Sequence, residues 1–396
     1  MKIAVIGGGA SGIVSAIFAK RINEKSSVTV FERSDRILKK LLATGNGRCN
    51  LSNAVIREDN YFSSTSGIVG KILSRFSAEE EKSFFESIGI MLAEEDGRIY
   101  PYSRRASSVL DALRFECEHL GIKIRTNAFI NKIEKKADTF IINGETFDRV
   151  ILSVGSNAAP SFGTDGNGIN LLNSLGHRAE KFRYALSPVK VKESTKALKG
   201  IRAKGSVTLY SKDEALRREV GEIQFTDYGL SGIAVMQLSR LCREGSVLSL
   251  DLIPELSKEE LYKMLTERKV RLSHLKAEDF LTGFLHKALC QYILNCAKVK
   301  PSAFAESLTK KDISVLTDFI KGLSFTVTSV IGKEQSQASS GGAYLSDFNP
   351  DTLESLKCPG LYCTGELLDV VGDCGGYNLH WAWTTGFIAG TNICSK

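Results

Sequence analysis

Long apolar runs, a second glycine-rich nucleotide motif and paired cysteines are all missing from this 396-residue chain. The longest early stretch without charge, residues 3–19, is interrupted by glycines, and no other apolar stretch reaches the roughly 20 residues that a membrane-spanning helix needs. We therefore expect a cytoplasmic protein without membrane contact.

The nine cysteines are odd in number and form no C-x-x-C pair, so neither a disulfide framework nor a metal site is expected. Cys358 and Cys363 have the C-x4-C spacing of flavin disulfide reductases. In those enzymes the pair lies on an early helix, whereas here it precedes a late predicted strand. We interpret this spacing as coincidental and expect reduced thiols.

Composition and charge are typical of a soluble globular enzyme. Apolar residues make up 43% of the chain and charged residues 24%, and a chain of this length is expected to form two or three domains. The net charge is +7, and the densest basic stretch runs from Lys190 to Lys204. Either a solvated strand face or a contact for an anionic substrate or RNA phosphate explains this stretch.

The most informative feature is a run of glycines after an apolar strand predicted at residues 2–6. Gly7, Gly9 and Gly12 have the G-x-G-x-x-G spacing of a dinucleotide-binding turn, in which they permit a tight turn, close approach of a pyrophosphate and helix packing. A second predicted strand, residues 27–31, is followed by Glu32. An acid at this distance binds the hydroxyls of an adenosine ribose and repels a 2′-phosphate, so the pattern favours FAD or NAD over NADP.

The remaining predicted elements alternate as in an α/β domain and then change character. Helices are expected at residues 67–88 and 106–120, and strands at 123–125, 128–134, 139–142 and 149–154. Later strands are expected at 189–191, 205–210, 221–225, 247–252 and 323–330. Residues 257–322 read as helical, with a capping box at Ser257–Glu260 and helical periodicity at 281–294, and residues 335–342 read as a loop.

These changes indicate an insertion within a nucleotide-binding domain. We expect this discontinuous domain at residues 1–187 and 334–396, a β-rich substrate domain at 188–256 and 319–333, and a helical domain at 257–318. No second G-x-G-x-x-G motif occurs, so a dedicated NAD(P)H domain is absent.

Two further glycine-rich segments carry groups suited to a cofactor. Residues 43–50 combine flexible backbone with amide donors and the charge of Arg48, and Lys40 lies just before them. Residues 365–380 lead into a helix predicted at 381–393, where the helix N-terminus would stabilise negative charge on a reduced flavin.

Five motifs occur in the order Gly-Gly-Gly-Ala-Ser-Gly (7–12), Thr-Gly-Asn-Gly-Arg-Cys-Asn (44–50), Tyr-Pro-Tyr-Ser-Arg-Arg-Ala (100–106), residues 221–232 and Gly-Gly-Tyr-Asn-Leu-His (375–380). Together they resemble the BaiN/YhiN-type family of bacterial FAD-dependent oxidoreductases, which includes aminoacetone oxidase and a bile-acid ene-reductase. The resemblance implies an α/β fold: a glutathione-reductase-like FAD-binding Rossmann domain with an inserted β-barrel domain and a helical domain. This chain departs from the family pattern at Leu38, Val371 and His380, where glycine, an acid and glutamine are common.

The residue patterns and the resemblance together give the candidate cofactor-binding residues. They are Gly7, Gly9, Ala10, Ser11, Gly12, Glu32, Arg33, Lys40, Gly45, Gly47, Arg48, Cys49, Asn50, Phe129, Gly155, Gly365, Glu366, Asp369, Gly375, Gly376, Tyr377, Asn378 and Leu379.

Candidates for acid–base catalysis are few. His380 and Tyr377 lie beside the predicted flavin helix, although packing or capping explains both side chains as well. We interpret Cys49 and Cys374 as packing thiols, because hydride transfer through a flavin needs no protein nucleophile.

We therefore expect an FAD-dependent oxidoreductase that moves a hydride through flavin N5. In the favoured interpretation NADH or NADPH docks transiently, and the substrate is a small enone of the 3-oxo steroid or bile-acid type. Alternatives are an aminoacetone-like amine oxidase that uses oxygen, and an RNA-modifying or RNA-binding flavoprotein motivated by Lys190–Lys204. Nucleic acid is not expected as a partner in the favoured interpretation, and the sequence leaves the oligomeric state open.

Overall fold

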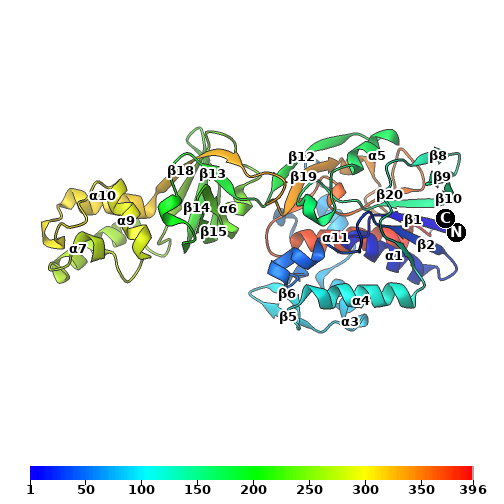
Figure 1. Cartoon of the computed structure of the whole chain (residues 1–396), viewed down its shortest axis with the longest axis horizontal. Helices are drawn as coiled ribbons and strands as arrows, with labels where there is room; N and C mark the ends of the chain where they lie inside the picture. Colours follow the sequence, from blue (N-terminus) through cyan, green and yellow to red (C-terminus); the bar gives the residue numbers. More distant parts are fainter. Residues whose placement is uncertain (395–396) are drawn as a thin grey trace. The chain divides into compact units, whose positions relative to one another are not determined.

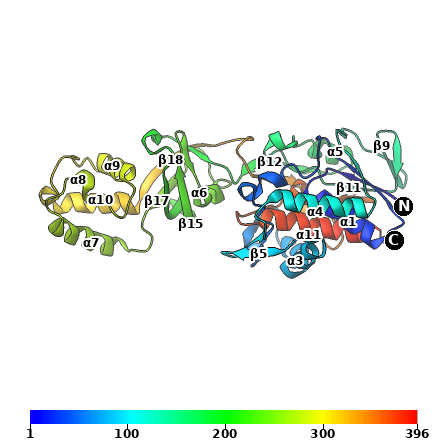
Figure 2. The ribbon, with the colours of Figure 1, turned by 60° about the horizontal axis from the view of Figure 1, so that its bottom comes forward.

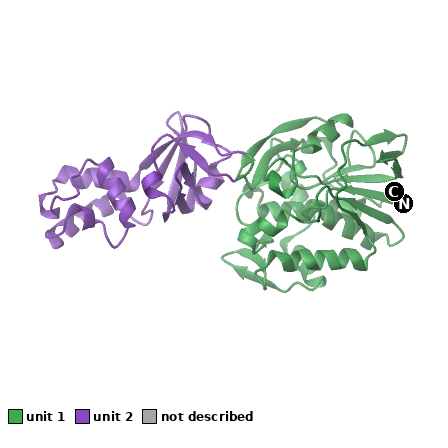
Figure 3. Cartoon of the chain, viewed as in Figure 1, with its two compact units in different colours: residues 1–185, 333–396 green, residues 186–332 purple. Residues whose placement is uncertain are grey.

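The computed structural model describes residues 1–394 of the chain (Figure 1). It divides into two compact units: unit 1 contains residues 1–185 and 333–396, and unit 2 contains residues 186–332 (Figure 3). Unit 2 is an insertion, and unit 1 is assembled from the two segments that flank it.

Unit 1 is organised around five parallel strands in the order β20-β11-β1-β2-β7. They are β1 (Lys2–Ile6), β2 (Ser27–Phe31), β7 (Lys123–Arg125), β11 (Arg149–Leu152) and β20 (Leu361–Cys363). Ile3 and Val5 pack with α1 (Ala10–Ile22), α4 (Ala106–His119) and α11 (Tyr377–Asn392), which appear together in Figure 2. Ala4 and Ile6 pack in a second core on the other face, because successive strand residues point to opposite sides.

Short strands and helices surround this sheet. They are η1 (Leu41–Gly47), β3 (Ser52–Asn53), η2 (Glu58–Asn60), β4 (Tyr61–Phe62), α2 (Val69–Leu73), α3 (Ala78–Ser87), β5 (Leu92–Glu95), β6 (Arg98–Pro101), β8 (Glu134–Lys136), β9 (Thr139–Ile142), β10 (Glu145–Phe147), η3 (Pro160–Phe162), α5 (Gly168–Ser174), β12 (Ala179–Ala185), β19 (Ala338–Ala343), η6 (Leu345–Asp347), η7 (Gly365–Leu367) and β21 (Val371–Gly372). They form the small sheets β10-β9-β8, β3-β6-β5, β12-β19 and β21-β4.

Two glycines allow α11 to lie directly against α1. A Cβ on Gly386 would come within 2.6 Å of the Ser11 carbonyl oxygen, and a Cβ on Gly390 within 2.6 Å of the Ser15 carbonyl oxygen. From the first contact to the second, each helix moves four residues toward its C-terminus, so the two helices run in the same direction. Their N-termini therefore point toward the same side of the sheet.

Unit 2 contains a closed barrel with the strand order β13-β16-β15-β14-β17-β18. Its elements are β13 (Val189–Val191), η4 (Lys196–Leu198), β14 (Arg202–Ser211), β15 (Glu214–Phe225), β16 (Gly229–Ser231), α6 (Ile233–Leu238), β17 (Val247–Asp251), α7 (Lys258–Arg271), α8 (Ala277–Phe280), α9 (Lys287–Cys296), η5 (Ala305–Ser307), α10 (Lys310–Lys321) and β18 (Leu323–Val330). Phe225 and Phe325 of the barrel share one apolar core with Leu265, Ile293 and Leu316 of the helices. The predicted capping box is present, since Ser257 and Glu260 exchange hydrogen bonds at the start of α7.

The predicted α/β fold with an inserted barrel and helices is confirmed, but two segments fold differently from the prediction. Residues 128–133, predicted as part of a strand, are irregular, and β8 begins only at Glu134. Ile130 and Ile133 are buried there, so the apolar pattern reflects burial of a loop. Residues 335–342, predicted as a loop, contain most of β19. The hydrogen bonds between β19 and β12 are made by backbone groups, which serine and glycine supply as well as any other residue.

Two helix predictions have shifted boundaries. The helix predicted at 67–88 is divided into α2 and α3, because Ser77 adopts extended backbone and caps α3 through a capping box with Glu80. Helical structure in the predicted segment 281–294 begins only at Lys287.

Within residues 1–394 none of the nine cysteines forms a disulfide, Cys358 and Cys363 included. Within residues 1–394, no helix has both the length and the apolar character needed to cross a membrane.

Candidate functional site

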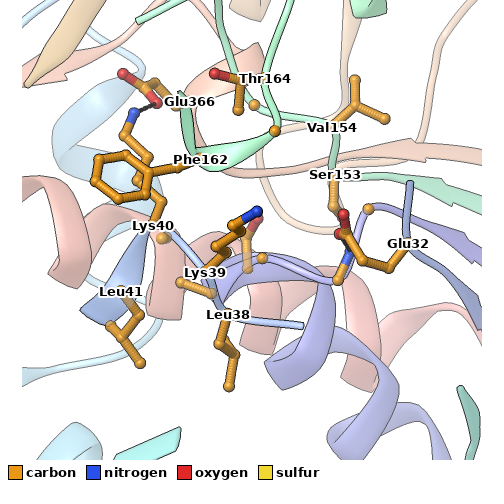
Figure 4. A pocket seen from close by; sticks show the side chains of 18 of the residues that line it. Glu32, Leu38, Lys39, Lys40, Leu41, Ser153, Val154, Phe162, Thr164 and Glu366 are labelled. Carbon is orange, nitrogen blue, oxygen red and sulfur yellow. Dashed lines mark hydrogen bonds and ion pairs between the residues drawn. The ribbon is translucent and has the colours of Figure 1, made fainter. Parts of the chain in front are cut away.

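A cavity in unit 1 lies where β1, β2 and β11 end and where α1 and α11 begin (Figure 4). Its walls are the glycine turn after β1, Glu32 after β2, residues between Leu38 and Thr44, residues between Ser153 and Asn167, and the first turns of α11. In open α/β sheets the carboxyl ends of the strands are where ligands bind.

The glycines of the turn are required for two different reasons. A Cβ on Gly7 would lie 2.3 Å from the Ser153 carbonyl oxygen, and a Cβ on Gly12 would lie 2.0 Å from the Gly7 carbonyl oxygen. A Cβ on Gly9, which lines the cavity, would meet nothing within 4 Å. The amides of the first turn of α1 have no intrahelical acceptor, so the open space beside Gly9 suits a phosphate group.

The Glu32 carboxylate is held in the cavity wall by main-chain donors. Its Oε2 accepts the Gly8 N–H at 2.8 Å, and its Oε1 accepts the Ser34 N–H at 2.7 Å. Each oxygen keeps a second lone pair for a ribose hydroxyl. Nearby in the lining, the Arg33 guanidinium stacks 4.7 Å from the centroid of the Phe129 ring. These groups form an acidic and aromatic end of the cavity.

An ion pair lies on the opposite side of the cavity from Glu32 (Figure 4). The Lys40 ammonium is 2.7 Å from Glu366 Oε2, and Glu366 Oε1 accepts the Ser339 N–H at 2.9 Å. The Glu366 carboxylate is therefore fixed, and it holds Lys40 at the wall.

The N-terminus of α11 completes the cavity. Its cap, Gly376, has a left-handed φ of 100°, and a Cβ there would lie 2.3 Å from the Ser52 carbonyl oxygen. The Asn378 side chain closes the preceding loop by exchanging two hydrogen bonds of 2.9 Å with the backbone of Gly372. Asn378 and Leu379 line the cavity, so the positive end of the helix dipole faces it and favours negative charge there.

A family profile described as HI0933-like protein Rossmann domain matches residues 1–392. The chain belongs to the HI0933-like family. A relative from Clostridium scindens, described as a 3-dehydro-bile acid delta(4,6)-reductase, is 37% identical over 98% of both chains. Two relatives described as ribosomal RNA dihydrouridine synthases, from Haemophilus influenzae and Escherichia coli, are 26% and 24% identical over 98% of this chain and 97% of their own.

Membership of the HI0933-like family confirms the predicted BaiN/YhiN-type resemblance, the FAD-binding Rossmann fold and an FAD-dependent oxidoreductase. The cavity fits FAD by the chemistry of its walls. Glu32 suits the ribose, the α1 amides beside Gly9 suit the pyrophosphate, and the α11 N-terminus suits a ring that gains negative charge. When bound, FAD supplies the hydride-transfer chemistry.

Many of the predicted cofactor residues of this HI0933-like chain line the cavity. They are Gly7, Gly9, Ala10, Ser11, Glu32, Arg33, Lys40, Phe129, Gly155, Glu366, Asn378 and Leu379. The other predicted residues lie outside the cavity lining: Gly12, Gly45, Gly47, Arg48, Cys49, Asn50, Gly365, Asp369, Gly375, Gly376 and Tyr377.

Three of the outlying residues have other partners in the structure. Arg48 stacks 5.0 Å from the Tyr100 ring centroid and is 3.8 Å from the Glu95 carboxylate. Asp369 is buried and accepts backbone N–H groups from Ser64 and Gly341. Cys49 is also buried, and burial raises the pKa of its thiol to about 12, which suits the predicted packing role.

The two catalytic candidates do not line the cavity. His380 is fully buried, and its Nδ1 contacts the Glu81 carboxylate and lies 3.2 Å from Ser52 Oγ. The Tyr377 ring packs edge-on against Tyr61 with centroids 5.8 Å apart, and burial raises the pKa of the Tyr377 phenol. Their contacts are those of side chains that support the cavity wall.

Several lining residues were not among the predictions. Phe162, Thr164 and Asn167 lie between β11 and α5, in a segment that contains η3 and has no recognisable motif. Gln337 is brought to the wall by the β12–β19 ladder. For Trp381 the sequence did contain a signal, because Trp381 is two residues from the predicted Leu379 on the same helix. In the structure its indole N–H donates to the Gly365 carbonyl oxygen.

Proposed function

We propose that this FAD-dependent oxidoreductase is a reductase of carbon–carbon double bonds conjugated with a carbonyl group, and that NADH or NADPH supplies its electrons. The named relatives support this reaction class. A 3-dehydro-bile acid with delta(4,6) double bonds is a conjugated ketone, and uracil, which dihydrouridine synthases reduce, has its double bond conjugated with a carbonyl. Relatives with different substrates thus share one type of acceptor bond.

The observation that carries the proposal is the placement of the α11 N-terminus at the cavity. Gly376, which has no side chain to cap the helix, leaves its first amides available, and Asn378 and Leu379 bring that end to the cavity wall. Donors fixed there stabilise negative charge where it develops. Glu32 and the α1 turn would hold the rest of an extended dinucleotide, which would leave its redox-active ring for the end of the cavity at α11.

The electron donor follows from what the sequence does not contain. Since only one G-x-G-x-x-G motif is present, we propose that NADH or NADPH docks transiently rather than in a domain of its own. We further propose a small 3-oxo steroid or bile-acid type enone as the substrate, on the strength of the 37% identical relative.

An anaerobic stopped-flow experiment tests this function. The purified protein is mixed with NADH and with NADPH in turn, and the oxidised-flavin band at about 450 nm is followed. We expect rapid bleaching with one of them, and recovery of the band when a 4-en-3-one steroid is added without oxygen. Bleaching by an amine instead, with recovery in air and peroxide release, would establish the amine oxidase alternative.

The distribution of charge favours RNA as a second candidate substrate. Unit 2 contains 23 Lys and Arg against 17 Asp and Glu, so it carries +6 of the net charge of +7. In the predicted stretch Lys190–Lys204, Lys199 pairs with Asp227 and Arg202 with Glu222. Part of that stretch is therefore neutralised.

The helical part of unit 2 also has exposed cations. Arg271, Lys276 and Lys300 are exposed, and the backbone of Lys276 forms an isolated antiparallel β-bridge with Phe304, a residue that is 50% exposed. Exposed cations beside an aromatic ring are typical of single-stranded RNA contacts.

Binding of a uridine-containing ribosomal RNA fragment at several salt concentrations tests this candidate. Neutralising Arg271, Lys276 and Lys300 to glutamine should weaken binding and flatten its salt dependence, without changing the flavin spectrum. Unchanged binding, or no binding at low salt, would remove RNA as the substrate.

A further inference from the structure

A buried carboxylate and a buried imidazole meet behind the first turn of α11. Glu81 of α3 is 1% exposed, and His380 of α11 is 0% exposed. Glu81 Oε2 contacts His380 Nδ1, and Ser52 Oγ of β3 donates to the same carboxylate oxygen at 2.8 Å. Ionisable groups so deeply buried are rare unless they are paired or functional.

The hydrogen bonds indicate the charge state of this pair. Glu81 Oε2 receives the Ser52 hydroxyl and the His380 Nδ1–H, and two donors to one oxygen favour the ionised carboxylate. Within residues 1–394, His380 is the one ion-pair partner of Glu81. Because an uncompensated buried charge is strongly unfavourable, we infer an imidazolium at His380, whose Nε2 atom has no hydrogen-bond partner within residues 1–394.

Other titratable groups face the pair without neutralising it. Cys49 and Tyr61 lie close enough for the Glu81 charge to add to the effect of burial, which raises the pKa of both groups. Asp373 and Tyr377 face Tyr61 in turn. None of these four groups is a cation, but the charges of Arg57 and Arg98 reach Tyr377 and partly oppose the effect of burial on its pKa. Both arginines are unchanged in every variant of Glu81 and His380, so differences between the variants report the pair.

The pair is adjacent to the cavity through the backbone. His380 follows Leu379, which lines the cavity, in the first turn of α11. Ser52 continues into Asn53, whose Nδ2 donates to the Gly375 carbonyl oxygen at 3.0 Å. β3 and α11 therefore contact both the charge pair and the loop that caps α11.

We propose that Glu81 and His380 are positioning residues that hold an internal ion pair behind the α11 N-terminus, and that the balance of this pair sets how strongly that end of the cavity stabilises negative charge. The reduction potential of bound FAD is the quantity that reports it. The proposal rests on FAD binding in this cavity and does not depend on the identity of the substrate.

Two substitutions, made singly and together, remove one or both charges of the pair while nearly preserving its shape. Glu81→Gln removes the counterion of His380, and at a pH low enough to keep the imidazole protonated it should raise the midpoint potential of FAD, because the reduced, more negative flavin is then favoured. His380→Gln leaves an unpaired carboxylate, and at a pH high enough to keep Glu81 ionised it should lower the potential. The double variant is neutral again and should return close to the wild-type value.

The experiment measures the midpoint potential of the FAD-loaded wild type and of these variants by equilibration with a redox dye at several pH values from about 5 to about 9, which span the ordinary pKa of histidine. Ser52→Ala is the matched control, since it removes a hydrogen bond from Glu81 without changing any charge. Opposite shifts in the two single variants, cancelled in the double variant and small in the control, support the proposal. Equal potentials throughout, or a control shift as large as that of Glu81→Gln, would overturn it.

A second measurement applies when a variant does not retain FAD. Urea unfolding of the four proteins without cofactor forms a double-mutant cycle. If Glu81 and His380 form an ion pair, the double variant should lose much less unfolding free energy than the sum of the losses in the two single variants. A loss in the double variant equal to that sum would contradict the pair. Absence of enone reduction would leave both measurements intact, so failure of the proposed substrate class is distinguished from failure of this inference.

Discussion

The Lys40 ammonium lies 2.7 Å from the Glu366 carboxylate, although the two residues are 326 positions apart in the chain. Lys40 follows β2 in the segment before the insertion, and Glu366 lies in η7 after it. The ion pair thus connects the two segments of unit 1 at the cavity wall.

Replacing Lys40 with methionine should weaken FAD binding about tenfold, which is about 1.4 kcal/mol. The substitution removes a cation from the wall and leaves the Glu366 carboxylate uncompensated beside an anionic cofactor. Fluorescence titration of the apoprotein with FAD measures the change. Glu366→Gln is the matched control, because glutamine still accepts the Ser339 N–H and leaves Lys40 in place. If Lys40→Met binds FAD as tightly as the wild type, the ion pair has no role in cofactor binding.

Alanine at Gly9 and alanine at Gly12 should have different effects. The Cβ of Gly9→Ala enters open space in the cavity, so the apoprotein should keep its stability and lose affinity for FAD. The Cβ of Gly12→Ala meets the Gly7 carbonyl oxygen, so this variant should lose about 2 kcal/mol or more of unfolding free energy. Thermal unfolding with and without FAD separates the two effects. Equal destabilisation of both apoproteins would contradict the structure of the turn.

Replacing Glu32 with glutamine should reduce affinity for FAD about tenfold and leave affinity for FMN unchanged. Glutamine cannot accept hydrogen bonds at both side-chain positions, so either the Gly8 or the Ser34 N–H loses its acceptor and the ribose loses a charged one. FMN lacks the adenosine ribose and provides the internal control. Parallel losses for FAD and FMN would show that Glu32 acts on the fold instead.

His177 should make the stability of the protein depend on pH. Its ring is buried and stacked on Phe348 with centroids 4.9 Å apart. Ser355 Oγ accepts the N–H groups of Lys357 and Cys358, so its hydroxyl donates to His177 Nε2, 2.8 Å away, which requires a neutral imidazole. Burial lowers the pKa of His177, and the nearby Asp347 carboxylate opposes this effect only in part.

Because the folded state disfavours the protonated ring, stability is fully present above about pH 6.5, the ordinary pKa of histidine, and falls as the pH drops below it. Urea unfolding at several pH values should show a shallower loss on acidification in His177→Gln than in the wild type. The exposed His119→Gln serves as the control and should follow the wild type. A steeper loss of stability in His177→Gln than in the wild type would show that the folded state does not disfavour the protonated His177 ring.

The parts of the site that could be predicted are those fixed by local chain geometry. The turn at Gly7–Gly12 and the acid at Glu32 follow from a strand, a turn and a helix adjacent in sequence, and the structure places residues 7–11 and Glu32 in the cavity wall. Gln337 could not be predicted, because pairing with a strand on the other side of the insertion brings it to the wall.

Glu81 illustrates the same limit. It is the last of three consecutive acids that begin a helix, a pattern that reads as a solvated first turn. Only the packing of α3 selects Glu81 for burial while Glu79 and Glu80 remain near the solvent. No local property of the sequence distinguishes these three residues.

The ladder between β12 and β19 has a further consequence for how this chain can change. Ala185, the last residue before the insertion, pairs with Ala338, shortly after its end. In topological terms unit 2 is an enlarged hairpin connection whose entrance and exit are neighbours. A whole module can be lengthened, shortened or exchanged at such a connection while β12 and β19 stay in register, so unit 2 is free to diverge while unit 1 keeps its architecture.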